Sequence, residues 1–169
     1  MEKKFETAAG HDPAAFFILI NHPLKFKWFL LNRLPAAFMA GLRMHHCSEQ
    51  MCTVSVPFKK LTQNPFRSTY FACLAMAAEM TTGALVMAQI YKRRPSLSML
   101  IVSMESKYHK KAIGLTRFTC SEGTLVKDII NEAYTSGTAQ SIKLHSKGVN
   151  ELDELVAEFW FTWSFKVKQ

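Results

Sequence analysis

The stretch NPFRSTYFACLAMAAEMTTGALVMAQIYKRRP, residues 64–95, carries a single carboxylate, Glu79, in the middle of a long apolar run. Ser68 is a typical N-cap residue, and the cations that precede Pro95 are typical of a helix C-terminus. The pattern predicts a helix of about six turns that is apolar on nearly every face. Such a helix must be covered all round, by a sheet wrapped around it, by a partner subunit, or by both.

The sequence on either side of this helix predicts mainly strands. Alternating polar and β-branched residues, or dense aromatic residues, are typical of strands, whereas apolar residues at helical spacing closed by Gly137 predict one further helix. The expected elements are one or two short amphipathic helices in residues 12–34, two strands in 41–58, strands in 97–112 and 113–120, a helix over 124–136, and strands in 139–148 and 155–168. This order predicts an α+β protein in which an antiparallel sheet curls around one central helix.

Length and composition indicate one globular unit. The chain has 169 residues, of which 49% are hydrophobic, enough for a single full core. The net charge of +8 favours acidic partners: phosphate-bearing ligands, nucleic acid or anionic membrane surfaces. The four cysteines form no CxxC pair, and the chain opens without a convincing secretory segment. We therefore expect free thiols and a cytoplasmic protein.

Two apolar stretches invite comparison with membrane spans. Residues 14–20 are too short, because a spanning helix needs about 20 apolar residues. Residues 68–91 are long enough, but Glu79 would be expensive at mid-bilayer. The sequence therefore predicts no stable membrane insertion.

Glu79 and Asn64 are the candidate chemical groups. Burial of an unpaired carboxylate raises its pKa, and such groups concentrate where general acid or base chemistry occurs. The alternative for Glu79 is a buried ion pair or a backbone cap. The amide of Asn64 can polarise a carbonyl or hold a water beside the N–H groups of the helix start. The alternative for Asn64 is a loop residue that forms an Asx-turn.

The segment NPFRSTYFACLAMAAEM resembles the central helix of the hot-dog fold acyl-CoA thioesterases, in particular the phenylacetate-type branch and its divergent relatives. That branch has an Asn, a His-Gly-Gly step into the helix, and an acidic residue fifteen positions after the Asn, a spacing that Asn64 and Glu79 reproduce. KKAIGLTRFTC and LVAEFWFTWSFKVK resemble later strands of the family, so the likeness runs from about Gly41 to Lys168. It implies an N-terminal helical extension in residues 1–40 and a hot-dog domain in residues 41–169.

The resemblance also implies a site. Glu79 would act as general base or nucleophile, Asn64 would orient water, and the Phe71 backbone N–H would stabilise an oxyanion. In this fold the site forms at a dimer interface, with Asn64 of one subunit facing Glu79 of the other, so we expect a homodimer or a dimer of dimers. Gly83, one turn beyond Glu79, suits a close approach of backbones there.

The chain departs from the family at the helix start. Tyr70-Phe71-Ala72 stands where the family has His-Gly-Gly, and the Phe71 side chain would crowd the carbonyl. Two functions follow as expectations: hydrolysis of an acyl-CoA or acyl-carrier thioester, or, as the alternative, binding of an acyl or lipid ligand without hydrolysis. Tyr70, Ala72 and Gly83 are the expected substrate contacts. No cofactor is expected beyond the coenzyme A moiety of the substrate.

Basic and aromatic residues offer further contacts. The candidates for binding the phosphates of coenzyme A are Arg93, Arg94 and Lys110, together with Lys92, Lys107 and Lys111. The alternative is a solvated basic surface. An aromatic run that includes Phe16 and Phe29 suits an acyl tunnel, a membrane surface or packing on the outer face of the sheet, and we favour the last. His residues lack the spacing of a zinc site, and no metal is expected. Charge-driven binding to a membrane surface or to nucleic acid is a third, less favoured function.

Overall fold

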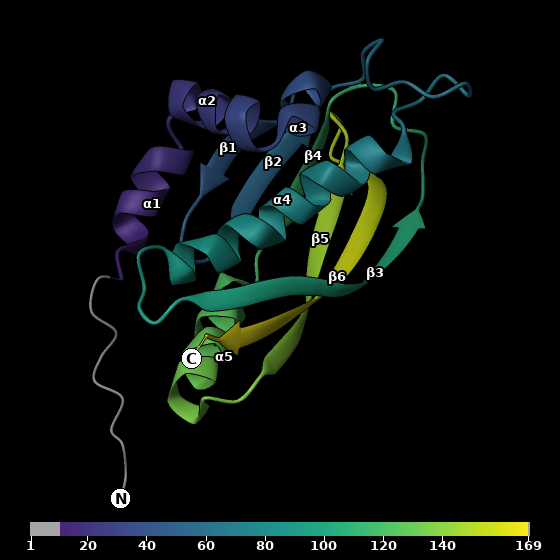
Figure 1. Ribbon diagram of the computed structural model, residues 1–169. Coiled ribbons are helices and arrows are strands. Elements are labelled where there is room, and N and C mark those ends of the chain that lie inside the picture. The colour runs from purple at the N-terminus through teal and green to yellow at the C-terminus, as the bar shows by residue number, and fades with distance from the viewer. Residues whose placement is uncertain (1–10, 169) are drawn as a thin grey trace, which may run out of the picture.

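Six antiparallel strands form one sheet in the computed structural model, which describes residues 11–168. The spatial order of the strands is β1-β2-β4-β5-β6-β3, and the sheet curls around helix α4, Phe71–Ile90 (Figure 1). The strands are β1 Arg43–Cys47, β2 Cys52–Val56, β3 Leu97–Tyr108, β4 Thr116–Cys120, β5 Gln140–Val149 and β6 Leu155–Val167. The predicted α+β architecture is confirmed.

Strand β6 shows why the sheet wraps α4. Its buried and half-buried residues alternate, as expected when one face of a strand packs on a core. Phe159, Phe161 and Phe165 are buried on the inner face, and Trp163 donates from Nε1 to Thr82 Oγ1 of α4 at 3.1 Å. The aromatic residues that predicted a long strand therefore form the inner face of the sheet, against which α4 packs.

Helix α4 begins at Phe71 and not at the predicted N-cap Ser68. The backbone before it is committed elsewhere: the Ser68 N–H donates to Asn64 Oδ1 at 3.2 Å, and the Tyr70 N–H donates to the Thr62 carbonyl at 2.7 Å. Because those donors bind a loop, the helix does not begin at Ser68, and Thr69 and Tyr70 stay extended. Tyr70 becomes the N-cap residue, without a side-chain cap.

Three short helices cover the side of α4 that the sheet leaves open: α1 Pro13–Ile20, α2 Pro23–Arg33 and α3 Pro35–Ala40. We call them the cap. Each begins with a proline, which suits the first helical position because its missing N–H would have no partner there. Phe16, Ile20, Phe26 and Leu30 are buried in the shared core. The predicted placement of the aromatic run on the outer face of the sheet is therefore wrong.

The physical reason lies in the hydrophobicity of α4, which is apolar all round. A sheet can cover only part of such a helix, and the cap supplies apolar side chains on the same concave side, beside β1 (Figure 1). At the far end of α4, helix α5, Gly123–Ser136, packs against α4 and β5 and ends at Gly137 with φ 67°. Residues 1–10 of the expected extension and Gln169 of the expected domain lie outside the described residues.

Within residues 11–168, two segments are long and apolar enough to cross a membrane by composition: α4, and α1 with α2 taken as one segment bent by 91°. In α4, 67% of the apolar window is buried inside the protein. This burial is that of a core helix, as Thr81 illustrates, since its hydroxyl lies 2.8 Å from the Ser146 hydroxyl of β5.

Candidate functional site

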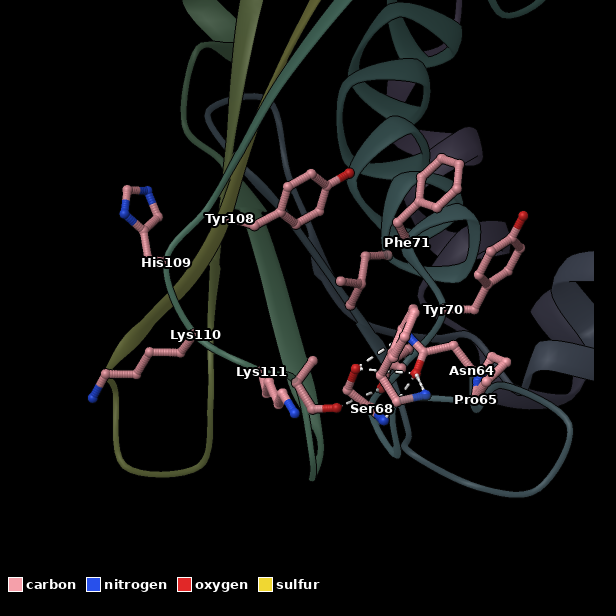
Figure 2. A pocket seen from close by; sticks show the side chains of 13 residues that line it. Asn64, Pro65, Ser68, Tyr70, Phe71, Tyr108, His109, Lys110 and Lys111 are labelled. Carbon is pink, nitrogen blue, oxygen red and sulfur yellow. Dashed lines mark hydrogen bonds between the residues drawn. The ribbon is translucent and has the colours of Figure 1, made fainter.

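A hollow of about 580 Å³ opens at the N-terminal end of α4. It lies between the loop of residues 64–70, the first turn of α4 and the chain that follows β3 (Figure 2). We call it the helix-mouth hollow. It brings together four of the predicted site residues: Asn64, Tyr70, Phe71 and Lys110.

Asn64 organises the loop at the base of this hollow. Its Oδ1 accepts from the Phe66 N–H at 2.9 Å and from the Ser68 N–H at 3.2 Å, and its Nδ2 donates to Ser68 Oγ at 3.1 Å (Figure 2). This is the Asx-turn that the sequence left open as the alternative. The amide is largely committed to the loop, and a part in orienting water would use the remaining Nδ2 hydrogen.

The start of α4 has free backbone donors, of which that of Phe71 belongs to a residue that lines the same hollow. The first N–H groups of a helix have no partner within it, and among residues 11–168 the N–H groups of Phe71 and Ala72 form no hydrogen bond. With the positive end of the helix dipole they form a site suited to an anion or an oxyanion. The Phe71 side chain is 50% exposed and its ring lies edge-on to Tyr70, with centroids 4.9 Å apart. Two aromatic rings therefore flank the donors.

A second, smaller cavity of about 250 Å³ lies beside the middle of α4, under the cap. We call it the Glu79 cavity. Apart from Glu79, the described residues that line it carry no ionisable side chain; they are Phe16, Leu19, Ile20, Phe26, Phe29, Leu34, Met80, Gly83, Ala84, Met87 and Met99. Such a lining suits an apolar ligand.

Glu79 is the polar group of this cavity. Desolvation by burial raises its pKa from the ordinary 4.5 to about 7. Within residues 11–168 no hydrogen bond or ion pair reaches its carboxylate, so the ion-pair alternative is not what the structure shows. A Cβ at Gly83 would lie 2.9 Å from Glu79 Oε1, so glycine at this position leaves room for the carboxylate against the helix.

The two halves of the predicted site do not meet within one protomer. Eight residues separate Phe71 from Glu79 on the same helix, a rise of about 12 Å. No side chain of residues 11–168 lines both the helix-mouth hollow and the Glu79 cavity. Within a single chain, one carbonyl group therefore cannot contact both the Phe71 N–H and the Glu79 carboxylate. Ala72 lines neither space.

The predicted phosphate contacts are also separated. The Arg93 guanidinium lies over the Tyr134 ring at 3.8 Å and donates to Asn131 Oδ1 at 2.9 Å, and desolvation lowers its pKa. Arg94 is exposed just beyond α4. Lys110 pairs with Glu154 at the other end of the molecule. The 20 residues of α4 span about 30 Å, so these cations do not form one cluster in the protomer.

The sequence of residues 24–164 matches the family described as a domain of unknown function, DUF4442. The chain belongs to this family. The match begins inside the expected extension, and the boundary between residues 40 and 41 stays a prediction. A search of curated proteins found no match to this DUF4442 chain.

Solved structures resemble the DUF4442 chain in fold. A Pseudomonas aeruginosa protein of unknown function, described as a probable thioesterase, is 20% identical and has a TM-score of 0.70, over 86% of this chain and 97% of that one. A putative thioesterase from Shewanella oneidensis is 11% identical, with a TM-score of 0.68 over 86% and 96%. A thioesterase from Haemophilus influenzae is 12% identical, with a TM-score of 0.60 over 84% and 90%. The predicted hot-dog fold is confirmed.

The structure adds site residues that the sequence reasoning missed. Tyr108 lines the helix-mouth hollow at the end of β3, on the same stretch of chain as the predicted phosphate contact Lys111, as Figure 2 shows. Met80, Met87 and Met99 line the Glu79 cavity. The nine methionines in the chain were a signal, because flexible thioethers are common where a site accommodates variable apolar ligands.

Proposed function

We propose that this DUF4442 protein binds an acyl thioester, an acyl-CoA or an acyl-carrier conjugate, and hydrolyses it at a site shared by two subunits. The observation that carries the proposal is Glu79: a desolvated carboxylate with a pKa of about 7, no partner in residues 11–168, and an apolar cavity beside it. At neutral pH about half of such a group is ionised, which suits a general base.

The shared site follows from the separation of Glu79 and Phe71. Strand β3 is an edge strand whose partner in the described chain is β6 alone. It is 12 residues long and exposes Leu100, Val102 and Met104, and a long apolar edge of this kind is a template for another strand. Pairing of two β3 strands about a two-fold axis would form a homodimer.

The same axis would assemble the proposed site. It sets the two α4 helices antiparallel, so that the N-terminus of one faces the later turns of the other. It also places the Tyr108 end of one β3 beside the Leu97 end of the other. Lys110 of one subunit and Arg94 of the second would then lie on the same side, as phosphate contacts for coenzyme A. A dimer of dimers is compatible with this arrangement.

The proposed reaction uses groups from both subunits. Ionised Glu79 takes a proton from water, and the oxygen of that water adds to the thioester carbonyl carbon. The Phe71 N–H group of the other subunit donates to the oxyanion that forms. The C–S bond then breaks, and the leaving thiolate receives the proton held by Glu79. The products are a carboxylic acid and a thiol.

The test is turnover of a panel of acyl-CoA esters by the protein and by Glu79→Gln. The expected result is hydrolysis of at least one ester, lost in the variant by a factor on the order of 10² to 10⁴, with binding of a non-hydrolysable acyl-CoA thioether retained. Glu132→Gln, an exposed change on α5, serves as the matched control. Equal turnover by Glu79→Gln and the parent would remove Glu79 from the mechanism.

A second candidate function is acyl or lipid binding without hydrolysis. Two observations favour it: Tyr70 and Phe71 flank the free donors at the helix mouth, and the Asn64 amide is bound within its loop. It predicts tight binding of the acyl-CoA thioether by the parent protein together with no turnover of any ester in the panel.

A further inference from the structure

Helix α2 has two apolar faces. Phe26 and Leu30, four positions apart, are buried in the core. At 100° per residue, Leu24, Trp28 and Leu31 lie on the opposite face, where they are 70%, 68% and 47% exposed. The core needs only the face that carries Phe26 and Leu30. The exposed side chains of Leu24, Trp28 and Leu31, which we call the α2 stripe, therefore have no role in folding.

Cations surround the α2 stripe. Residues 13–40 contain Lys25, Lys27 and Arg33 and no Asp or Glu. Neither lysine forms an ion pair within residues 11–168, and both are exposed. By helical position the two lysines flank the stripe on either side. Lysine stems can lie along an apolar surface while their ammonium groups reach the phosphate level of a bilayer.

The apolar surface extends from α2 to α1. Ile18 of α1 is 68% exposed, and a shallow hollow of about 460 Å³ involves Leu19, Trp28 and Phe29. Helices α1 and α2 lie together at one side of the molecule, with α4 between them and β3 (Figure 1). This apolar and basic surface is therefore separate from the edge at which a second subunit would pair.

We propose that the outer face of α1 and α2 docks on an anionic phospholipid bilayer. Leu24, Trp28 and Leu31 enter the interface, and the lysines bind lipid phosphates. An amphipathic helix with a Trp and leucines on one face and lysines beside them is the chemistry of an interfacial anchor, and it needs no spanning segment.

Charge and shape argue against the other occupants of this face. Two copies of the chain docked through it would bring six cations together without a carboxylate from residues 13–40 to neutralise them. A nucleic acid would use the lysines, but it offers little to the aliphatic Leu24 and Leu31, because a single-strand site stacks bases on aromatic rings. An anionic bilayer offers phosphates to the lysines and an apolar interior to the leucines.

The position of the surface links it to the candidate site. Leu19 and Phe29 line both the outer hollow and the Glu79 cavity, so these two side chains form the wall between them. Resting on the proposed function, this arrangement gives acyl chains a route from the bilayer to Glu79. The docking itself is independent of that function.

The experiment is flotation of the full chain with phosphatidylcholine vesicles, with and without phosphatidylglycerol, at low and at physiological salt. We expect binding to the anionic vesicles and a blue shift of Trp emission that Trp28→Phe removes. Leu24→Ser/Trp28→Ser/Leu31→Ser should lose about ten-fold or more in binding for each side chain. Lys25→Gln/Lys27→Gln should lose about five-fold per lysine. Lys147→Gln/Lys166→Gln removes the same charge from the outer face of the sheet and should retain binding within about two-fold.

Several results would overturn the proposal. One is the absence of flotation with anionic vesicles at low salt. Another is an equal loss of binding in the two lysine double variants, which would indicate general charge rather than this surface. A lower sedimenting mass of the triple serine variant with unchanged vesicle binding would identify a subunit interface. Vesicle binding retained by the triple variant alongside lost oligonucleotide binding would identify a nucleic-acid site. Vesicle binding is measured without turnover, so it stands or falls apart from thioester hydrolysis.

Discussion

Glu79 carries a free-energy penalty that depends on pH. Its carboxylate is desolvated and has no donor among residues 11–168, so the native state favours the protonated acid. The unfolded chain returns the group to water and to its ordinary pKa. Between about pH 4.5 and pH 7 the native state therefore binds a proton that the unfolded state has lost, and the stability of the fold falls as pH rises through this window.

The corresponding prediction concerns Glu79→Gln. The parent protein should lose about 3 kcal/mol of unfolding free energy from this group between about pH 5 and pH 8, and the neutral amide should remove that loss. The variant should thus be the more stable protein at pH 8 and nearly equal to the parent at pH 5. Urea unfolding at both pH values measures the difference, with exposed Glu132→Gln as the control. An unchanged pH slope in Glu79→Gln would mean that the carboxylate is solvated in the native state.

At this scale the sequence indicates Glu79 but not the state of Asn64. A lone carboxylate in an apolar helix can be recognised without a structure. The residues on nearly every face around Glu79 are apolar, so the sequence already predicts that the helix is buried. Whether Asn64 points to a ligand or into its loop depends on how residues 64–68 close, and the Arg67 φ of 58° shows how tight that turn is. Local pattern leaves both outcomes open.

The elements themselves were predictable where periodicity was strong. The helices and strands of the hot-dog fold occur where alternation, apolar spacing and Gly137 predicted them. The start of α4 was not predictable. Ser68 has the chemistry of an N-cap residue, but its N–H and hydroxyl form hydrogen bonds with Asn64 instead. The predicted position of the aromatic run was also wrong. The sequence shows that Phe16 must be buried, but it does not show which surface of the protein buries it.

Strand β3 gives the prediction at the scale of elements. Val102 is 54% exposed, at an irregularity in the pairing of β3 with β6. Val102→Lys should leave the protomer folded, because edge lysines are tolerated, and should oppose pairing of two β3 edges by charge. We expect a monomer by sedimentation and loss of thioester hydrolysis. Leu152→Lys, a change at a 79% exposed position outside the sheet edge, is the control. A Val102→Lys dimer with full activity would exclude β3 as the interface.

For the whole molecule, the question is whether the cap is a separate unit. The sequence suggested an extension before a domain, since a proline-punctuated helical segment precedes the first strand. In the structure the cap has no core of its own: Phe16, Ile20, Phe26 and Leu30 complete the core around α4. A helix that is apolar all round needs that cover, so cap and sheet should unfold together.

Two substitutions on opposite faces of α2 test this coupling. Phe26→Ala removes a 3% exposed side chain from the shared core and should reduce the unfolding free energy of the whole protein by about 3–5 kcal/mol, in one cooperative transition. Trp28→Ala, two positions away and 68% exposed, should change it by no more than about 0.5 kcal/mol. Urea unfolding followed by circular dichroism and by Trp fluorescence measures both. Two separate transitions in Phe26→Ala would show that the cap unfolds on its own. A large loss of unfolding free energy in Trp28→Ala would mean that the α2 stripe belongs to the core and is not a bilayer-binding surface.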